Sequence, residues 1–378
     1  MGGRLVGRSE EAAEKLARVR AFLGERDLDG ALFTDQRLVA WVTGGLEDVI
    51  VRGGAVSFVW ALVTPDHAVL LTQNIEGPRV LAEEAPETIG FEVATFPWET
   101  EALARLVTER CDPARLATDG GGPGLAMPAE LQELRLALTA GEQGRLRALG
   151  ADASGALEDA MRRVRRGMSE RELAAEIAWG LERTGTVACV LLVGSDERRA
   201  RFRHPTVSAA TIERDALAVI VAVRGGLNVA CTRTVSIGPP DPTLLERHRA
   251  ASAVEARMIG QTQPGATYGE ALEAGVDAYA ELGYPEEWRH HYQGGPIGYD
   301  TREFGPTPLA VPNAFTPHPV ALDHACAWNP TVQGAKSEDT FLVGEAGPEL
   351  VTNSAGWPAE GHAAGAGTTI PRPAILEL

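Results

Sequence analysis

Five short polar clusters in the second half of the chain hold residue types that acid–base catalysis and anion binding require. Histidine titrates closest to neutral pH, arginine offers a planar fork for carboxylates, and glutamate can hold a cationic or amide group. The clusters lie at residues 201–205, 231–234, 290–295, 301–303 and 329–339. The sequence contains no P-loop, H-E-x-x-H, G-x-S-x-G or EF-hand motif, so no common signature explains them.

Three of these side chains have both a functional and a structural interpretation. His204 could act as a general acid or base, or could pack beside Pro205. Glu338 could point into a site, or could pair with Lys336 or an arginine on a solvated turn. Arg302 could bind a substrate carboxylate, or could form a salt bridge with a nearby acid.

The segment from His290 to Pro296 holds two further candidates. His290 and His291 are adjacent, so on an extended segment they point to opposite faces, and we prefer His291 for a shared cleft. The pair Gly294 and Gly295 either brings the main chain close to a ligand or forms a structural turn. The four cysteines stand far apart and are interpreted as buried thiols, with Cys326 in an apolar core strand.

Alternating helical and strand-like patterns predict an α/β fold. In the first part they indicate a helix capped by Ser9 over 10–25, a strand over 31–33, a hairpin over 56–63 and 68–71, helices over 79–84 and 129–138, and a glycine-rich loop over 119–124. In the second part they indicate a helix over 142–166 and strands over 187–193, 216–223, 325–328 and 340–343.

Two similar helix starts suggest a repeat in the second part. Ser169 with Glu172, and Thr267 with Glu270, are both capping boxes that precede apolar helices. Such boxes also arise by chance, but each of these helices leads into strands, as an internal duplication would. We therefore expect two half-domains related by a pseudo-twofold axis with a cleft between them. The predicted domains are 1–139 and 140–378.

Composition limits the class of protein. A chain of 378 residues with 44% apolar residues is too large for one ordinary core, which favours two domains. The net charge of −17 argues against a nucleic-acid partner, and the absence of a long apolar run argues against a membrane span or secretory leader, so a cytoplasmic protein is expected. Only Lys15 and Lys336 are lysines, a bias that genome composition would explain.

The order of the clusters resembles the pita-bread family of Xaa-Pro aminopeptidases, prolidases and creatinases, over most of the chain. Residues 231–234 (Cys-Thr-Arg-Thr) match the "ITRT" stretch that follows the second metal-binding aspartate of that family. This match places Ala230 at the second aspartate and either Val219 or Ile220 at the first. Gly295 then stands at the histidine of "GHGIG", and Asn329 at the glutamate of "EPG".

The resemblance therefore implies that four of five metal ligands are replaced and that Glu338 alone remains. One carboxylate and a neutral amide do not make a divalent cation site. No metal and no cofactor are expected.

Creatinases are the members of this family that catalyse hydrolysis without a metal ion. The chain resembles them at positions outside the four replaced metal ligands. His204 with Pro205 matches the "HSP" stretch of their catalytic histidine, Glu338 matches "REHD", and Arg302 with Glu303 matches the carboxylate-binding "GRE". Thr232 departs from the creatinase glutamate in "ERT", which argues against creatine as substrate. The predicted catalytic residues are His204 and Glu338. The predicted substrate-binding residues are Arg302, Glu303, His291, Tyr292, Thr232 and Asn329.

The resemblance implies a metal-independent hydrolase of a carbon–nitrogen bond in a small amino-acid-derived, amidine-like or peptide-like substrate. Two alternatives remain at this stage. One is a non-catalytic ligand- or partner-binding protein of the same fold, and the other is a metal-dependent Xaa-Pro peptidase that uses His290, His291 and Glu338. Two-domain relatives usually pair, so a homodimer is also expected.

Overall fold

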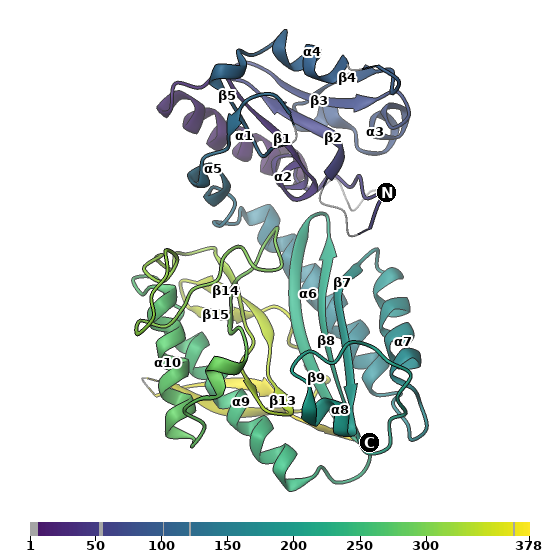
Figure 1. Ribbon diagram of the computed structural model, residues 1–378, viewed down its shortest axis with the longest axis vertical. Coiled ribbons are helices and arrows are strands. Elements are labelled where there is room, and N and C mark those ends of the chain that lie inside the picture. The colour runs from purple at the N-terminus through teal and green to yellow at the C-terminus, as the bar shows by residue number, and fades with distance from the viewer. Residues whose placement is uncertain (1–6, 53–55, 101, 121, 366) are drawn as a thin grey trace. The chain divides into compact units, whose positions relative to one another are not determined.

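The computed structural model describes residues 7–52, 56–100, 102–120, 122–365 and 367–378 (Figure 1). It divides into two compact units. One runs to Glu142 and takes in Gly225–Leu227, and the other consists of Gln143–Arg224 and Asn228–Leu378. Each unit combines helices with its own sheet, as the predicted two-domain α/β class requires.

The first unit is built on a six-stranded sheet in the order β4-β3-β2-β1-β5-β6. Its elements are α1 (Arg8–Glu25), β1 (Gly30–Asp35), α2 (Gln36–Val42), β2 (Val56–Val63), β3 (Ala68–Gln73), α3 (Gly77–Glu83), β4 (Glu92–Phe96), α4 (Ala102–Thr108), β5 (Leu116–Thr118), β6 (Leu125–Ala126) and α5 (Ala129–Glu133). The predicted hairpin is confirmed, because β2 and β3 pair antiparallel. The predicted cap was wrong: α1 begins at Arg8 after a left-handed Gly7, so Ser9 lies inside the helix.

A buried lysine ties the start of this unit to its end. Lys15 on α1 is completely buried, and its ammonium lies 2.5 Å from Glu11 Oε1 and 2.7 Å from Glu142 Oε1. A buried charge is tolerated only when it is paired in this way.

The second unit has a larger sheet in the order β10-β11-β14-β9-β8-β7, with β15 paired to β14 and β18 to β9. Its helices are α6 (Ala140–Met161), which starts in the first unit, α7 (Glu170–Glu182), α8 (Asp196–Arg201), α9 (Pro242–Gln261) and α10 (Tyr268–Glu281). Its strands are β7 (Val187–Ser195), β8 (Asp215–Arg224), β9 (Leu227–Ser236), β10 (Gly294–Pro296), β11 (Ala325–Trp328), β12 (Thr331–Val332), β13 (Ala335–Lys336), β14 (Asp339–Gly344), β15 (Gly347–Leu350), β16 (Ala359–Gly365), β17 (Thr368–Pro373) and β18 (Leu376–Glu377).

Both predicted capping boxes are present. The Ser169 hydroxyl accepts from the amide of Glu172 while that glutamate accepts from the amide of Ser169, and Thr267 and Glu270 repeat the arrangement. In the main sheet, α7 leads into β7 and β8, and α10 precedes β10 and β11. Strands β9 and β14 meet at the centre of the sheet, so the two halves adjoin there.

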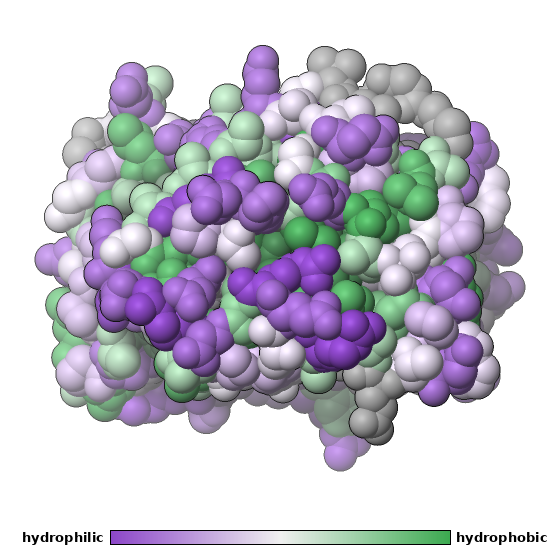
Figure 2. All heavy atoms as spheres, turned by 90° about the horizontal axis from the view of Figure 1, so that it is seen from above, coloured by the Kyte–Doolittle hydropathy of each residue, from purple (hydrophilic) through white to green (hydrophobic). Residues whose placement is uncertain are grey.

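The face seen in Figure 2 mixes broad hydrophilic areas with smaller hydrophobic patches. Among the residues described, no helix has the length and apolar character needed to cross a membrane.

Candidate active site

Two of the predicted site residues, Thr232 and Glu338, lie side by side where β9 and β14 meet. They are neighbours because Cys231 pairs with Asp339 in the sheet. The Thr232 amide donates to the carbonyl oxygen of Glu338 at 3.0 Å. The Thr232 hydroxyl donates to Glu338 Oε2 at 2.9 Å, so one hydrogen bond from Thr232 holds the main chain of Glu338 and another holds its carboxylate. Thr232 therefore positions the Glu338 carboxylate, which was predicted to be catalytic.

Two cations share the Glu338 carboxylate. Arg302 Nη2 donates to Oε1 at 2.8 Å, and Lys336 Nζ lies 3.3 Å from Oε2. Burial alone would raise the pKa of the Glu338 carboxyl, but Lys336 and Arg302 outweigh it and hold that pKa below its usual value. Glu338 is therefore an anion, 1% exposed, whose charge is more than matched by its neighbours. Glu338 is buried, as its inward-pointing interpretation required, and it does pair with Lys336, but the solvated turn expected for that pair was wrong.

A pair of histidines forms the second part of the site. His204 lies on the loop after α8 and is exposed, whereas His291 is buried, and their Nε2 atoms are 3.0 Å apart. Burial, together with the charge of Lys336, lowers the pKa of His204, although Glu338 opposes this change. Burial and the same lysine lower the pKa of His291 to about 2. Both rings are consequently neutral near pH 7, and one Nε2 must donate to the other.

A short loop presents Arg302. Glu303 Oε1 accepts from the amides of Tyr299 and Asp300 at 2.7 and 3.1 Å, and the Glu303 amide donates to the carbonyl oxygen of Pro296 at 2.9 Å. Glu303 thus stabilises the conformation of this loop, and its carboxylate contacts loop amides, whereas Arg302 contacts Glu338. Sequence spacing alone could not separate Glu303 from Arg302, because the two are adjacent.

The other predicted binding residues lie next to this cluster. The Tyr292 hydroxyl donates to the carbonyl oxygen of Phe304 at 3.2 Å, and the tyrosine is half exposed. Asn329 is buried, and its amide donates to the carbonyl oxygen of Gln293 at 3.0 Å. Within the described part of the chain, Asn329 Oδ1 and His291 Nδ1 are buried without a hydrogen-bond partner. Buried polar atoms of this kind are uncommon, so both atoms are candidates for contact with a bound molecule or ion.

The family resemblance implies metal ions, and the residues present do not fit them. Val219, Ile220 and Ala230 are buried apolar side chains, and Gly295 has no side chain to offer. Across the described ranges, no three histidine, cysteine, aspartate or glutamate side chains are grouped so that they could hold a metal ion. Two cationic side chains on Glu338 also oppose the approach of a dication.

The double glycine has a structural explanation. Gly294 and Gly295 belong to β10, and both have positive φ angles, 93° and 149°. A Cβ on Gly294 would meet the carbonyl oxygen of Ala327 at 2.3 Å, and one on Gly295 would meet Pro306 Cδ at 3.0 Å. Close packing of neighbouring protein atoms therefore accounts for both glycines. The structural alternative predicted from the sequence was a turn, but the segment is a short strand.

Two features of this region were missed or mispredicted from the sequence. Lys336 was considered only as a surface partner of Glu338, but it is 5% exposed. Cys189 was expected to be buried and is exposed, whereas the core position of Cys326 is confirmed. The cause is a bulge, because Ala188 and Val190 pair with consecutive residues of β8 and leave Cys189 as the extra residue.

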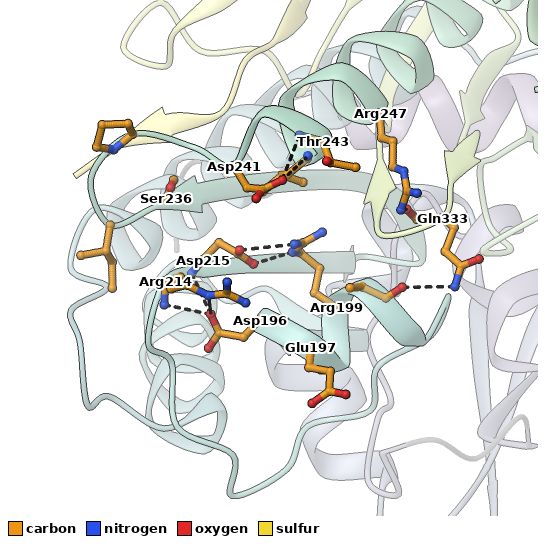
Figure 3. Close-up of a pocket in the computed structure, with 14 residues that line it drawn as sticks. Asp196, Glu197, Arg199, Arg214, Asp215, Ser236, Asp241, Thr243, Arg247 and Gln333 are labelled. Atoms are coloured by element: carbon orange, nitrogen blue, oxygen red, sulfur yellow. Dashed lines mark hydrogen bonds and ion pairs between the residues drawn. The ribbon is translucent and has the colours of Figure 1, made fainter. Parts of the chain in front are cut away.

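A hollow of about 590 Å³ lies elsewhere in the second unit, beside α8 and the start of α9 (Figure 3). Its acidic and basic side chains largely satisfy one another: Arg199 binds Asp215, and Arg214 lies beside Asp196. It contains none of the predicted site residues, and the paired charges leave little to attract a ligand.

Comparisons with known proteins match both units. Residues 144–345 match metallopeptidase family M24, and residues 15–142 match the creatinase/prolidase N-terminal domain. An uncharacterized peptidase, YqhT of Bacillus subtilis (strain 168), is 22% identical over 359 residues, which is 90% of this chain and 98% of that protein. An Xaa-Pro dipeptidase of Pyrococcus furiosus is 25% identical over 206 residues, 53% of this chain and 59% of that protein.

Solved structures share the fold. An Xaa-Pro dipeptidase from Bacillus anthracis superposes with a TM-score of 0.72 at 22% identity, covering 91% of this chain and 98% of its own. A prolidase from Pyrococcus horikoshii OT3 gives a TM-score of 0.73 at 18% identity, covering 90% and 98%. These likenesses confirm the predicted fold, a creatinase-type domain followed by a pita-bread domain.

Proposed function

This chain belongs to metallopeptidase family M24, and we propose that it hydrolyses a carbon–nitrogen bond in a small amino-acid-derived, amidine-like or peptide-like substrate. Membership of a peptidase family supports the reaction class. Two of the relatives reported above are named Xaa-Pro dipeptidases, which supports a short peptide as one of the substrates to test.

The observation that carries the proposal is the position of His204. It is exposed to an incoming substrate, its pKa is lowered, and its Nε2 lies 3.0 Å from a second, buried imidazole. Such a histidine can accept a proton from water at neutral pH. When it becomes an imidazolium, its Nε2–H can donate to His291, and the nearby Glu338 carboxylate stabilises the positive charge.

The proposed reaction balances within these groups. Water attacks the carbon of the scissile bond while His204 takes one of its protons, and the electron pair of the carbon–nitrogen bond leaves with the nitrogen. His204 then returns its proton to that nitrogen. General acid–base catalysis contributes about 10²- to 10⁴-fold, so orientation by Arg302 and Glu338 must contribute the remainder.

We further propose that this reaction does not use the dinuclear metal centre of the family. The residue types at the ligand positions support this, because an aliphatic or glycine residue offers no donor at Ala230 or Gly295. The names of the relatives favour the competing proposal, a metal-dependent Xaa-Pro peptidase. The two differ in what a chelator does.

One experiment separates these proposals. The purified full chain is assayed against Xaa-Pro dipeptides, other N-acyl amino acids and guanidino acids, with and without a chelator. We expect turnover of at least one compound, unchanged by chelator, and lost in His204→Ala. His290→Ala is the matched control, because His290 is an exposed histidine next to the site.

Each contrary outcome has a distinct meaning. Turnover that chelator abolishes and manganese, cobalt or zinc restores would establish the metal-dependent peptidase instead. Full turnover by His204→Ala would show that His204 is not the general base. Binding of these compounds without any turnover would favour a non-catalytic ligand-binding protein, because a pure binder does not need an acid–base histidine.

A further inference from the structure

Asn329 lies opposite Glu338 in the sheet. The pairing of β11 with β14 ends at Trp328 and Asp339, and the pairing of β12 with β13 continues it in the same register, so Asn329 and Glu338 face each other between the two. Their main-chain hydrogen bonds go outward to other strands, which makes them a non-hydrogen-bonded pair. Side chains of such a pair share one face and lie close together. The Asn329 side chain is therefore beside the Glu338 carboxylate.

The Asn329 carbonyl oxygen lacks a donor. Asn329 is 7% exposed, and its Oδ1 atom is buried without a hydrogen-bond partner. Neighbouring donors are bound elsewhere: Gln293 Nε2 donates to two main-chain carbonyl oxygens, and the Thr232 hydroxyl donates to Glu338. An unmet buried acceptor destabilises a fold, so this oxygen is expected to receive a hydrogen bond from a bound molecule.

Unpartnered polar atoms gather at this site. In the described part of the second unit, five buried side-chain atoms lack a hydrogen-bond partner. Three of them, Asn329 Oδ1, His291 Nδ1 and Arg302 Nε, belong to the candidate active site, and the other two are on Thr234 and Arg372. Folded proteins rarely leave buried polar atoms unpaired, so this concentration indicates where a polar ligand binds.

The charges around Glu338 limit which donor can reach Asn329. Arg302 Nη2 and Lys336 Nζ already lie 2.8 and 3.3 Å from the two carboxylate oxygens of Glu338. These two cations would repel a third, so an ammonium or guanidinium group is a poor partner for Asn329. A neutral N–H or O–H group remains. The reaction proposed above takes place at a carbon–nitrogen bond, which selects the N–H.

We propose that Asn329 accepts a hydrogen bond from a neutral N–H group at the scissile carbon–nitrogen bond of the substrate. This inference rests on the proposed function for the identity of the bond, but binding of the N–H group does not require turnover. The preferred substrates are then amides whose nitrogen carries hydrogen. A bond to a fully substituted nitrogen, such as an Xaa-Pro bond, offers no donor and is bound poorly.

The test compares two acids that differ in one group. N-acetylglycine presents an amide N–H, and acetoxyacetic acid has an ester oxygen in its place, without added bulk. Dissociation constants are measured by protein NMR titration of the full chain carrying His204→Ala, so that the proposed base consumes neither compound. We expect N-acetylglycine to bind about tenfold more tightly or better, because the ester oxygen would leave the buried Asn329 oxygen without a donor.

Variants of Asn329 separate ligand recognition from stability. Asn329→Leu has a similar volume but no acceptor, so the two compounds should bind equally. Asn329→Asp keeps an acceptor in the same position and should keep the preference. Gln333→Leu changes an exposed amide between β12 and β13, at the tip of the same hairpin, and should also keep it. A purely structural role would change both affinities alike and leave their ratio unaltered.

Three results would overturn the proposal. Equal binding of the two compounds before Asn329 is changed, including binding of neither, would show that the site does not recognise an N–H group. A preference that persists in Asn329→Leu, or in Asn329→Ala if the leucine variant does not fold, would assign recognition to another residue. Tighter binding of guanidinoacetate than of N-acetylglycine would show that the site takes a cation. The proposed base is tested by turnover and this inference by a binding ratio, so each can fail alone.

Discussion

Glu338 and Asp339 are neighbours at the start of β14, and their carboxylates bind separate sets of cations. Glu338 accepts from Thr232 and Arg302 on the side of the histidine pair. Asp339 accepts from Arg233 at 3.0 Å and from Arg372, both completely or almost completely buried. The two adjacent acids therefore have different roles: Glu338 belongs to the candidate site, and Asp339 belongs to a buried ion network.

Asp339→Asn is expected to destabilise the second unit strongly. The substitution leaves two buried guanidinium groups, Arg233 and Arg372, without a carboxylate that both contact. Breaking a buried ion pair by removing one partner costs about 3–5 kcal/mol. Thermal and denaturant unfolding followed by circular dichroism would measure the loss. Glu349→Gln is the control, because Glu349 pairs with Arg147 on the surface and should cost less than about 1 kcal/mol. Equal losses in both variants would contradict the buried network.

The hydrolysis rate should rise with pH on the acidic limb of the rate–pH profile, and the midpoint of this limb should reflect the pKa of His204. Hydrolysis needs the neutral imidazole as base, so the rate falls as His204 takes a proton. Burial and Lys336 lower the pKa of His204 from its usual 6.5, so the midpoint of this limb should lie below pH 6.5. A rate profile gives the midpoint, and an NMR titration of the free protein gives the pKa independently. A midpoint above 6.5 by both methods would mean that Glu338 outweighs burial and Lys336.

Lys336→Met should move that limb to higher pH. The positive charge of Lys336 disfavours a second charge on His204, so its removal raises the pKa of the imidazole. Arg214→Met should leave the limb in place, since Arg214 is a surface residue paired with Asp196. NMR titration of the His204 ring measures both variants. An unshifted His204 pKa in Lys336→Met would show that the ammonium is too far away or too well screened to act on the base.

Local sequence signals predicted the fold best where short-range contacts decide it. The capping boxes at Ser169 and Thr267 form from residues three apart, and both are present. The strand over 325–328 was predicted with its observed limits, because its run of apolar residues is buried on both faces. Helix α2 was missed, since Gln36–Val42 is short and owes its stability to the burial of Trp41 and its neighbours.

The site was predictable only in part. His204, Arg302 and Glu338 carry residue types and an order that the family resemblance identifies, although the chain separates them widely. The role of Glu303 and the exposure of Cys189 depend on a loop geometry and on a strand bulge, which one sequence does not reveal. Lys336 did carry a signal, the scarcity of lysine, but its meaning depends on burial.

Acid should destabilise the protein through His248. This histidine on α9 is completely buried, and burial, together with His362, lowers its pKa to about 4. The unfolded chain binds a proton at the usual pKa of 6.5, so between pH 6.5 and 4 the unfolded state holds more protons than the folded state. Stability contributed by neutral His248 is therefore complete above pH 6.5 and is lost as pH falls toward 4, by roughly 3 kcal/mol in all.

His248→Gln isolates this contribution from the other buried groups. Glu255 has the opposite effect, since burial raises its pKa to about 7 and its contribution to stability falls as pH rises. The pH dependence of wild-type stability therefore combines the effects of both groups. The difference in stability between wild type and His248→Gln should shrink as pH falls from 6.5 to 4. Thermal unfolding at half-unit pH intervals measures this difference. A wild-type advantage over His248→Gln that stays constant down to pH 4 would mean that His248 can be protonated inside the fold without cost.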